Sequence, residues 1–250
     1  MGIDWLLIAF GAWCFTVAVI GGLLGLVLGN IRLPLTLAVA SSPIAGVGAN
    51  IAISGITAGV AAFVHRGAGR IDRRIFWAMA PTSVIGVVVG ARIAGELPGD
   101  ALLVVIGGLL CWFGIDLLRR HPGADGAPGP QRPHLRLAGA GLVIGVLGGI
   151  VGLILGALRM PALLRAFPGR TAELVGTNLA IGCLLGLAGG LAHGFDQIDL
   201  KLVVVGALAS APGAVIGARL TGRLDERQLV RGIGVMLLVA GASTAARAFA

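Results

Sequence analysis

The stretches GGLLGLVLGNIRLP (Gly21–Pro34) and GGIVGLILGALRMP (Gly148–Pro161) are two copies of one glycine-rich pattern. Further matches at the same offset, 127 or 128 residues, pair Val47–Asn50 with Val175–Asn178, His65 with His193, and Gly86–Leu97 with Gly213–Leu224. Chance does not produce this many matches in register. The chain is therefore two tandem copies of one structural unit.

The composition places the chain in a membrane. Of its 250 residues 57% are apolar and only 12% are charged, and the mean hydropathy is +0.98. A soluble domain carries about 25% charged residues. A membrane helix needs about 20 apolar residues, and eight charge-free segments approach that length: Trp5–Ile31, Leu33–His65, Ile75–Ala91, Ala101–Ile115, Leu137–Leu158, Leu174–Phe195, Leu202–Ala218 and Gly232–Ala246. The sequence predicts an all-α integral membrane protein.

A polar segment separates the two copies. His121–His134 reads HPGADGAPGPQRPH, and its prolines and glycines are typical of a linker. We therefore predict a first membrane repeat over residues 1–120, a cytoplasmic linker over 121–136 and a second membrane repeat over 137–250. The first apolar segment lacks a basic start and is too long for a cleavable signal peptide.

The 19 basic residues discriminate between two topologies. Eight plain helices, four per copy, would leave 10 basic residues on one side and 9 on the other. Alternatively, the first element of each copy is a re-entrant hairpin that turns at Asn30–Pro34 or Ala157–Pro161, followed by three membrane helices. The copies are then inverted, and one side collects fourteen arginines: Arg66, Arg70, Arg73, Arg74, Arg119, Arg120, Arg132, Arg136, Arg165, Arg170, Arg219, Arg223, Arg227 and Arg231. Only Arg92, Lys201 and Arg247 remain opposite. The positive-inside rule favours the inverted arrangement, which predicts a multi-pass protein of the inner (plasma) membrane.

Arg32 and Arg159 are the two arginines that orientation does not explain. Each precedes a proline by two residues and lies deep in the membrane in the hairpin topology, where a charge is costly and indicates function. Pro34 and Pro161 suit the first turn of a returning half-helix, whose N-terminus favours an anion. These four residues predict a symmetric anion site near the membrane midplane. The alternative is that the arginines cap an interface or pair with a carboxylate.

Polar side chains near the tips extend this candidate site. Asn50 and Asn178 occupy equivalent positions early in the next helix, Thr177 adjoins one of them, and Asn30 lies at the first tip. An amide in hydrocarbon needs a partner. It can act as an interhelical clamp, or it can donate to a bound oxyanion without adding charge.

Four further residues are candidates for coupling or gating. His65 and His193 end equivalent helices and can titrate near neutral pH, although a histidine there can equally act as a C-terminal cap. Arg92 and Arg219 share the motif GAR and can equally be helix-end anchors. No acidic residue lies in the middle of a span, which argues against a cation site. Whether transport is coupled to a proton is left open by the sequence.

The sequence contains no enzyme signature. It has no GxSxG, HExxH or Walker motif, so the chain is not predicted to be an enzyme or to be driven by its own ATP hydrolysis. The three cysteines, Cys14, Cys111 and Cys183, lack metal-ligand spacing. No cofactor or metal is therefore expected. No nucleic acid partner is expected either, because membrane orientation explains most of the basic residues.

With these motifs the chain resembles the TauE/SafE sulfite-exporter family of permeases. The likeness covers nearly the whole chain and is carried by Gly86–Leu97, Gly213–Leu224 and the two opening stretches. It departs from the family where Arg32 and Arg159 replace a glycine-denser segment before each proline. The resemblance implies a secondary transporter of sulfite, sulfoacetate or other sulfonates. A passive anion channel and a non-transporting membrane scaffold are the alternatives. The partners are a small anionic substrate, the lipid bilayer and, as one open assembly, a second copy in a homodimer.

Overall fold

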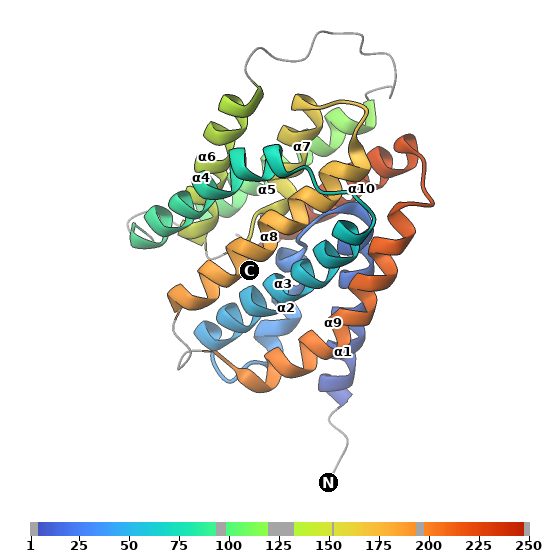
Figure 1. The fold of residues 1–250 in the computed structure, drawn as a ribbon. Coiled ribbons are helices and arrows are strands. Elements are labelled where there is room, and N and C mark those ends of the chain that lie inside the picture. Colours follow the sequence, from blue (N-terminus) through green and yellow to red (C-terminus); the bar gives the residue numbers. More distant parts are fainter. Residues whose placement is uncertain (1–4, 94–98, 120–132, 152, 194–197, 248–250) are drawn as a thin grey trace.

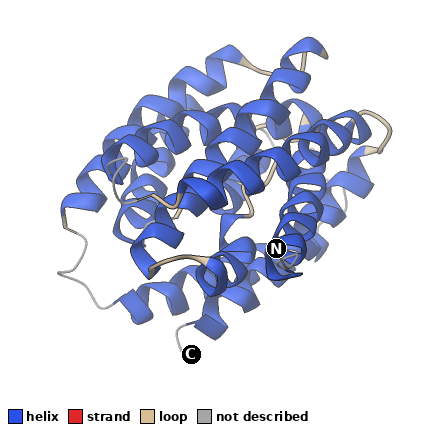
Figure 2. Ribbon diagram, turned by 90° about the horizontal axis from the view of Figure 1, so that it is seen from below, coloured by secondary structure: helices blue, strands red, loops and turns tan. Residues whose placement is uncertain are grey.

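The computed structural model describes residues 5–93, 99–119, 133–151, 153–193 and 198–247, and within them it contains ten α-helices and no strand (Figures 1 and 2). The first half forms α1 (Trp5–Leu24), α2 (Gly29–Val39), α3 (Pro43–Gly67), α4 (Arg73–Arg92) and α5 (Gly99–Arg119). The second half forms α6 (Pro133–Val151), α7 (Gly156–Ala166), α8 (Thr171–His193), α9 (Leu200–Thr221) and α10 (Glu226–Ala246).

Eight of the described helices are long and apolar enough to cross a membrane, and the two short ones are α2 and α7. Helices suit this sequence because each satisfies its own backbone hydrogen bonds where water is absent. The prediction of an all-α integral membrane fold is confirmed. The helical order long, short, long, long, long occurs once in each half of the chain.

The linker is shorter at its C-terminal end than the sequence predicted. Pro133 begins α6, because proline suits the first helical position, so residues 133–136 belong to that helix. The rest of the predicted linker lies outside the described residues.

The predicted position of the hairpin turns is wrong. Asn30–Pro34 and Ala157–Pro161 lie inside α2 and α7, and Pro34 is the sixth residue of its helix rather than a residue of the first turn. The chain leaves the helix earlier, at residues 25–28 and, in the second copy, at residues 153–155. We call these two non-helical segments the first and second break.

Gly25 explains why the first break begins where it does. Its φ of 72° lies in the left-handed region, and Leu26 N–H donates to Gly21 O (3.0 Å), which closes the end of α1. A Cβ on Gly25 would also lie 2.6 Å from Cα of Val175 in α8. Only glycine meets both conditions.

The first break and α2 together carry the chain back along α1. The imidazole of His65, at the end of α3, contacts Gly22 O near the end of α1 (3.2 Å). Toward the beginnings of the same helices, Phe10 and Ala49 share a buried cluster. Because α1 and α3 run in the same direction, the chain between them has to return, and α2 supplies most of that return.

The equivalent helices α3 and α8 pack antiparallel. A Cβ on Gly189 would lie 3.1 Å from Ile51 near one end, and a Cβ on Gly176 would lie 2.9 Å from the His65 Cβ near the other. The equivalent pair α5 and α10 is also antiparallel, since Gly107 adjoins Ala245 whereas the later residue in α5, Gly114, adjoins Gly234.

Two further close pairs are parallel and join the two halves of the chain. Gly11 approaches Ala209 and Gly22 approaches Ala214, so α1 and α9 run together. Their counterparts α6 and α4 do the same, because a Cβ on Gly141 would lie 2.8 Å from Met79 O and a Cβ on Gly149 would lie 2.8 Å from Ala91 N. The regularly spaced glycines thus serve close helix packing.

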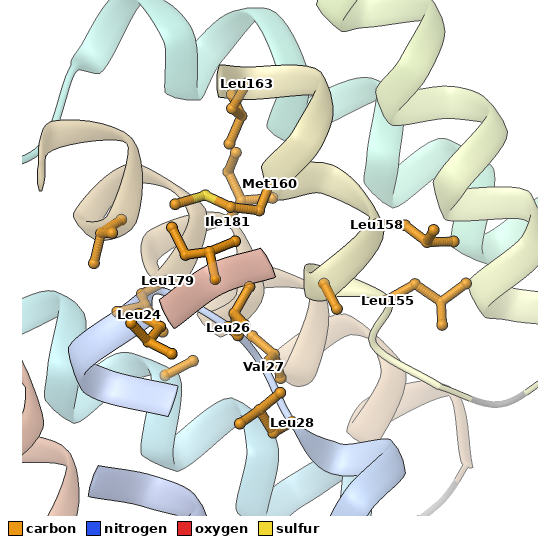
Figure 3. Close-up of a cluster of buried hydrophobic side chains, with 14 of the residues drawn as sticks. Leu24, Leu26, Val27, Leu28, Leu155, Leu158, Met160, Leu163, Leu179 and Ile181 are labelled. Carbon is orange, nitrogen blue, oxygen red and sulfur yellow. The ribbon is translucent and has the colours of Figure 1, made fainter. Parts of the chain in front are cut away.

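The two breaks meet inside the apolar core. A Cβ on Gly156 would lie 2.9 Å from the Cβ of Val27, so the start of α7 touches the first break. Figure 3 shows the surrounding side chains, which come from the end of α1, both breaks, α7 and α8: Leu24, Leu26, Val27, Leu28, Leu155, Leu158, Met160, Leu163, Leu179 and Ile181. This packing fixes where the polar residues after each break can lie.

Candidate functional site

Arg32 lies in the first turn of α2 and is only 2% exposed. Its Nε donates to Asn50 Oδ1 (3.0 Å), and its Nη2 donates to the backbone oxygen of Asn50 (2.9 Å) and to the hydroxyl of Ser54. Both partners project from α3. They lie four residues apart and therefore share one helical face.

Arg159 occupies the equivalent position in α7 and is 1% exposed. Its Nε donates to Asn178 Oδ1 of α8 (2.9 Å), as in the first copy. Its Nη2 is buried and forms no hydrogen bond. A buried donor without a partner is rare and requires an explanation.

Asn178 and Asn50 hold the breaks as well as the guanidinium groups. The Nδ2 of Asn178 donates to Gly156 O (2.9 Å) and, across the two copies, to Gly25 O (2.7 Å). The Nδ2 of Asn50 donates to Gly29 O (3.0 Å). An amide suits this position because it accepts from an arginine and donates to a carbonyl at the same time.

Neither guanidinium forms an ion pair with a carboxylate of the described residues. The ion pairs that the structure shows there involve Arg165 with Asp116, and Arg170 with Asp72 and Glu173. A buried charge without a counter-charge costs several kcal/mol. The local electrostatics therefore favour an anion beside each arginine, and the alternative of a carboxylate partner finds no support in the described residues.

Each arginine lines a small cavity of its own. The first cavity is bordered by Arg32, Ser54 and Gly22, and the second by Arg159 and Gly149. They leave about 20 and 30 Å³ for the centre of a water molecule. A single water needs roughly 10–15 Å³ measured in this way. The first cavity in this conformation therefore has room for one or two waters and the second for two or three, and a larger anion needs them to widen.

The structure separates Asn30 and Thr177 from these cavities. Asn30 Nδ2 donates to Ala240 O (3.2 Å) and to Thr244 Oγ1 (3.0 Å), so it ties α2 to α10. Thr177 Oγ1 accepts from Asp72 N–H (2.9 Å) at the end of the α3–α4 loop. Both side chains have structural partners where the sequence suggested substrate contacts.

The other predicted site residues are dispersed. Pro34 is exposed, whereas Pro161 is buried within α7. His65 is fully buried and contacts α1 instead of capping its own helix. The side chain of His193 lies outside the described residues.

Arg92 and Arg219 are exposed in the last turns of α4 and α9, where the sequence had suggested helix-end anchors. A cation there also complements the helix dipole.

Sequence reasoning missed two features. Ser54 is the first, although its spacing of four residues from Asn50 on a helix was a usable signal. The second is a bridge between the copies, in which Arg170 of the α7–α8 loop donates to Asp72 of the α3–α4 loop (2.8 Å). Burial raises the pKa of Asp72, but hydrogen bonds from the N–H groups of Ile75 and Arg74 and from Arg170 outweigh it and hold that pKa below its usual value.

This arrangement defines a multi-pass helical membrane protein with buried cationic sites at two helix breaks. The chain belongs to the sulfite exporter TauE/SafE family, whose model matches residues 10–244. It is also similar to a probable membrane transporter protein, YjnA, of Bacillus subtilis (strain 168), with 31% identity over 102 residues. That alignment covers 40% of this chain and 40% of YjnA. No solved structure matches the chain. The chain is thus a multi-pass membrane protein of a family described as sulfite exporters, and that family is not a class of enzymes.

Proposed function

We propose that this protein is a secondary transporter for a small oxyanion, with sulfite and organosulfonates such as sulfoacetate as the substrate class. The proposal is carried by the buried guanidinium groups of Arg32 and Arg159. Each has an amide partner, and neither has a carboxylate partner among the described residues. A guanidinium binds an oxyanion through several charge-assisted hydrogen bonds. The family description, sulfite exporter, supports sulfur oxyanions among the anions that would fit.

The transport test uses purified protein in proteoliposomes, with sulfite, sulfoacetate and sulfate as substrates. Arg32→Ala combined with Arg159→Ala is expected to abolish saturable uptake. Arg223→Ala is the matched control, because it removes an exposed arginine and leaves both breaks intact. Unchanged flux in the double variant would refute the assignment of the site.

The same preparation distinguishes a carrier from its alternatives. Counterflow exchange and saturation support a carrier, whereas a passive channel gives conductance without counterflow. A scaffold gives no flux and no rise in melting temperature with any of the anions.

We further infer that the two copies are inverted in the membrane. The antiparallel packing of the equivalent pairs α3 with α8 and α5 with α10 supports this topology, as does the arginine asymmetry. Ser41 and Pro168 provide a direct test, because they are exposed and lie in equivalent loops, α2–α3 and α7–α8. In a background without the native cysteines, Ser41→Cys and Pro168→Cys should react with a membrane-impermeant thiol reagent from opposite sides. Labelling from the same side would exclude inversion.

We make three further proposals about this protein. It lies in the inner membrane with its central linker in the cytoplasm. Its transport is coupled to protons through a histidine such as His65, and it assembles as a homodimer. His65 supports the second point, since its Nδ1 is buried and has no hydrogen-bond partner.

A further inference from the structure

The two break sites differ at the position that faces the outer nitrogen of the arginine. Ser54 in the first copy corresponds to Gly182 in the second, at the repeat offset of 128 residues. The Ser54 hydroxyl accepts from Arg32 Nη2, and the Asn50 backbone oxygen accepts from the same atom. Arg159 Nη2 makes neither contact. The Nη2 of Arg32 therefore has internal partners, and the Nη2 of Arg159 has none.

We propose that the anion binds directly to Arg159 and that Arg32 mainly holds the first break together. This inference rests on the proposed function and narrows it to one anion site per chain. The ligand is an anion that presents an oxygen to the guanidinium edge, such as sulfite or the sulfonate group of an organosulfonate. That oxygen takes the place that the Ser54 hydroxyl occupies in the first copy.

Gly182 explains why Arg159 Nη2 lacks the hydroxyl partner of the first copy. A Cβ on Gly182 would lie 3.6 Å from Arg159 Nη2 and 2.6 Å from Val27 Cγ2, so the apolar side chain of Val27 occupies this position and has to shift when an anion oxygen approaches the nitrogen. The cavity that Arg159 lines is otherwise apolar, with Ile51, Leu155 and Leu185 among its walls. An apolar wall strengthens the electrostatic attraction, because it excludes water from the charge.

The same cavity explains how a larger anion could be admitted. Gly148 and Gly149 of α6 line it, together with Val87 and Ala91 of α4. These helices pack closely, with glycines against backbone atoms of the partner helix, and no hydrogen bond joins them among the described residues, so an outward shift of α6 breaks none. An anion larger than water would therefore enter by separating α6 from α4.

The first test compares two conservative losses of charge. Arg159→Gln and Arg32→Gln are each titrated with sulfite, and affinity is read from the ligand-dependent rise in melting temperature. Arg159→Gln is expected to weaken sulfite binding at least ten-fold more than Arg32→Gln. Equal losses, or a larger loss for Arg32→Gln, would overturn the inference.

The second test adds a hydroxyl without removing charge, so it does not depend on Arg32→Gln folding. A Cβ on Gly182 would lie 2.6 Å from Val27 Cγ2, so the serine is introduced with Val27→Ala to make room. Relative to Val27→Ala alone, the double variant Val27→Ala/Gly182→Ser is expected to bind sulfite at least ten-fold more weakly. Equal affinity of the two variants would overturn the inference. A wild-type protein that responds to neither sulfite nor sulfoacetate would overturn the proposed function as well.

Discussion

Replacement of Asn178 by leucine isolates the contribution of the amide that joins the two breaks. Leucine has the same number and branching of side-chain heavy atoms, with larger methyl groups in place of the amide, so the change removes hydrogen bonds without opening a cavity. Three partners lose their contact with the side chain: Gly25 O at 2.7 Å, Gly156 O at 2.9 Å and Arg159 Nε at 2.9 Å. All three lie in the buried interior, where water does not replace the amide.

The expected loss of stability follows from these three contacts. Side-chain hydrogen bonds in a membrane protein are worth about 0.6 kcal/mol each on average, which sets a lower limit of about 2 kcal/mol. A buried polar group left without a partner costs about 1–3 kcal/mol, and more when it is charged, so the upper range is about 5 kcal/mol after allowing for non-additivity. For a chain of this size we expect the melting temperature to fall by about 4–20 °C.

The assay is thermal unfolding of the purified protein in one detergent at fixed pH, without added anion. Ser83→Ala is the matched control, because the hydroxyl of Ser83 is equally buried but has no hydrogen-bond partner. The control should change the melting temperature by less than 2 °C, as expected for a loss below about 0.5 kcal/mol. If Asn178→Leu is as stable as Ser83→Ala, the amide does not hold the breaks and the reasoning is refuted.

Gly186→Ala should destabilise the fold by about 1–3 kcal/mol in the same thermal assay, because its Cβ would meet the backbone of α3. Gly190→Ala in the same helix has no neighbour within 4 Å and should be neutral or slightly stabilising; equal effects would contradict the packing argument. The pKa of Asp72 is lowered in the fold, so its contribution to stability is present above the unfolded pKa and is lost as the pH falls through the folded value. Melting temperature between pH 6 and pH 3 should therefore fall less steeply in Asp72→Asn, and parallel curves would show that this carboxylate is not responsible. Asn30→Ala should lose about 1–2 kcal/mol by releasing α10 while sulfite affinity is retained; a selective loss of affinity would return Asn30 to the binding site.

Several parts of the candidate site were readable from the chain. The repeat offset paired Arg32 with Arg159 and Asn50 with Asn178, and the structure joins each arginine to the amide of its own copy. The location of the turns was not readable, because Pro34 suggested that the returning helix starts beside it, whereas the left-handed φ of Gly25 ends α1 earlier and α2 begins at Gly29. Many glycines in this sequence could have adopted that conformation, and local preference does not choose among them.

Composition and periodic spacing by themselves determined the class of fold. A chain so poor in charge must bury its backbone polar groups in helices, and the repeat dictates that each feature occurs twice. Only the tertiary structure decided what the repeated features do, because their partners come from distant segments. The backbone of Val175 lies so close to Gly25 that no residue with a Cβ fits there. Ser54 accepts from the Nη2 of Arg32, whereas Gly182 at the equivalent position offers no acceptor and the Nη2 of Arg159 has no partner. Hydrogen bonding and close packing act over a few ångströms in space, so a symmetric sequence pattern becomes an asymmetric site once such partners are brought together.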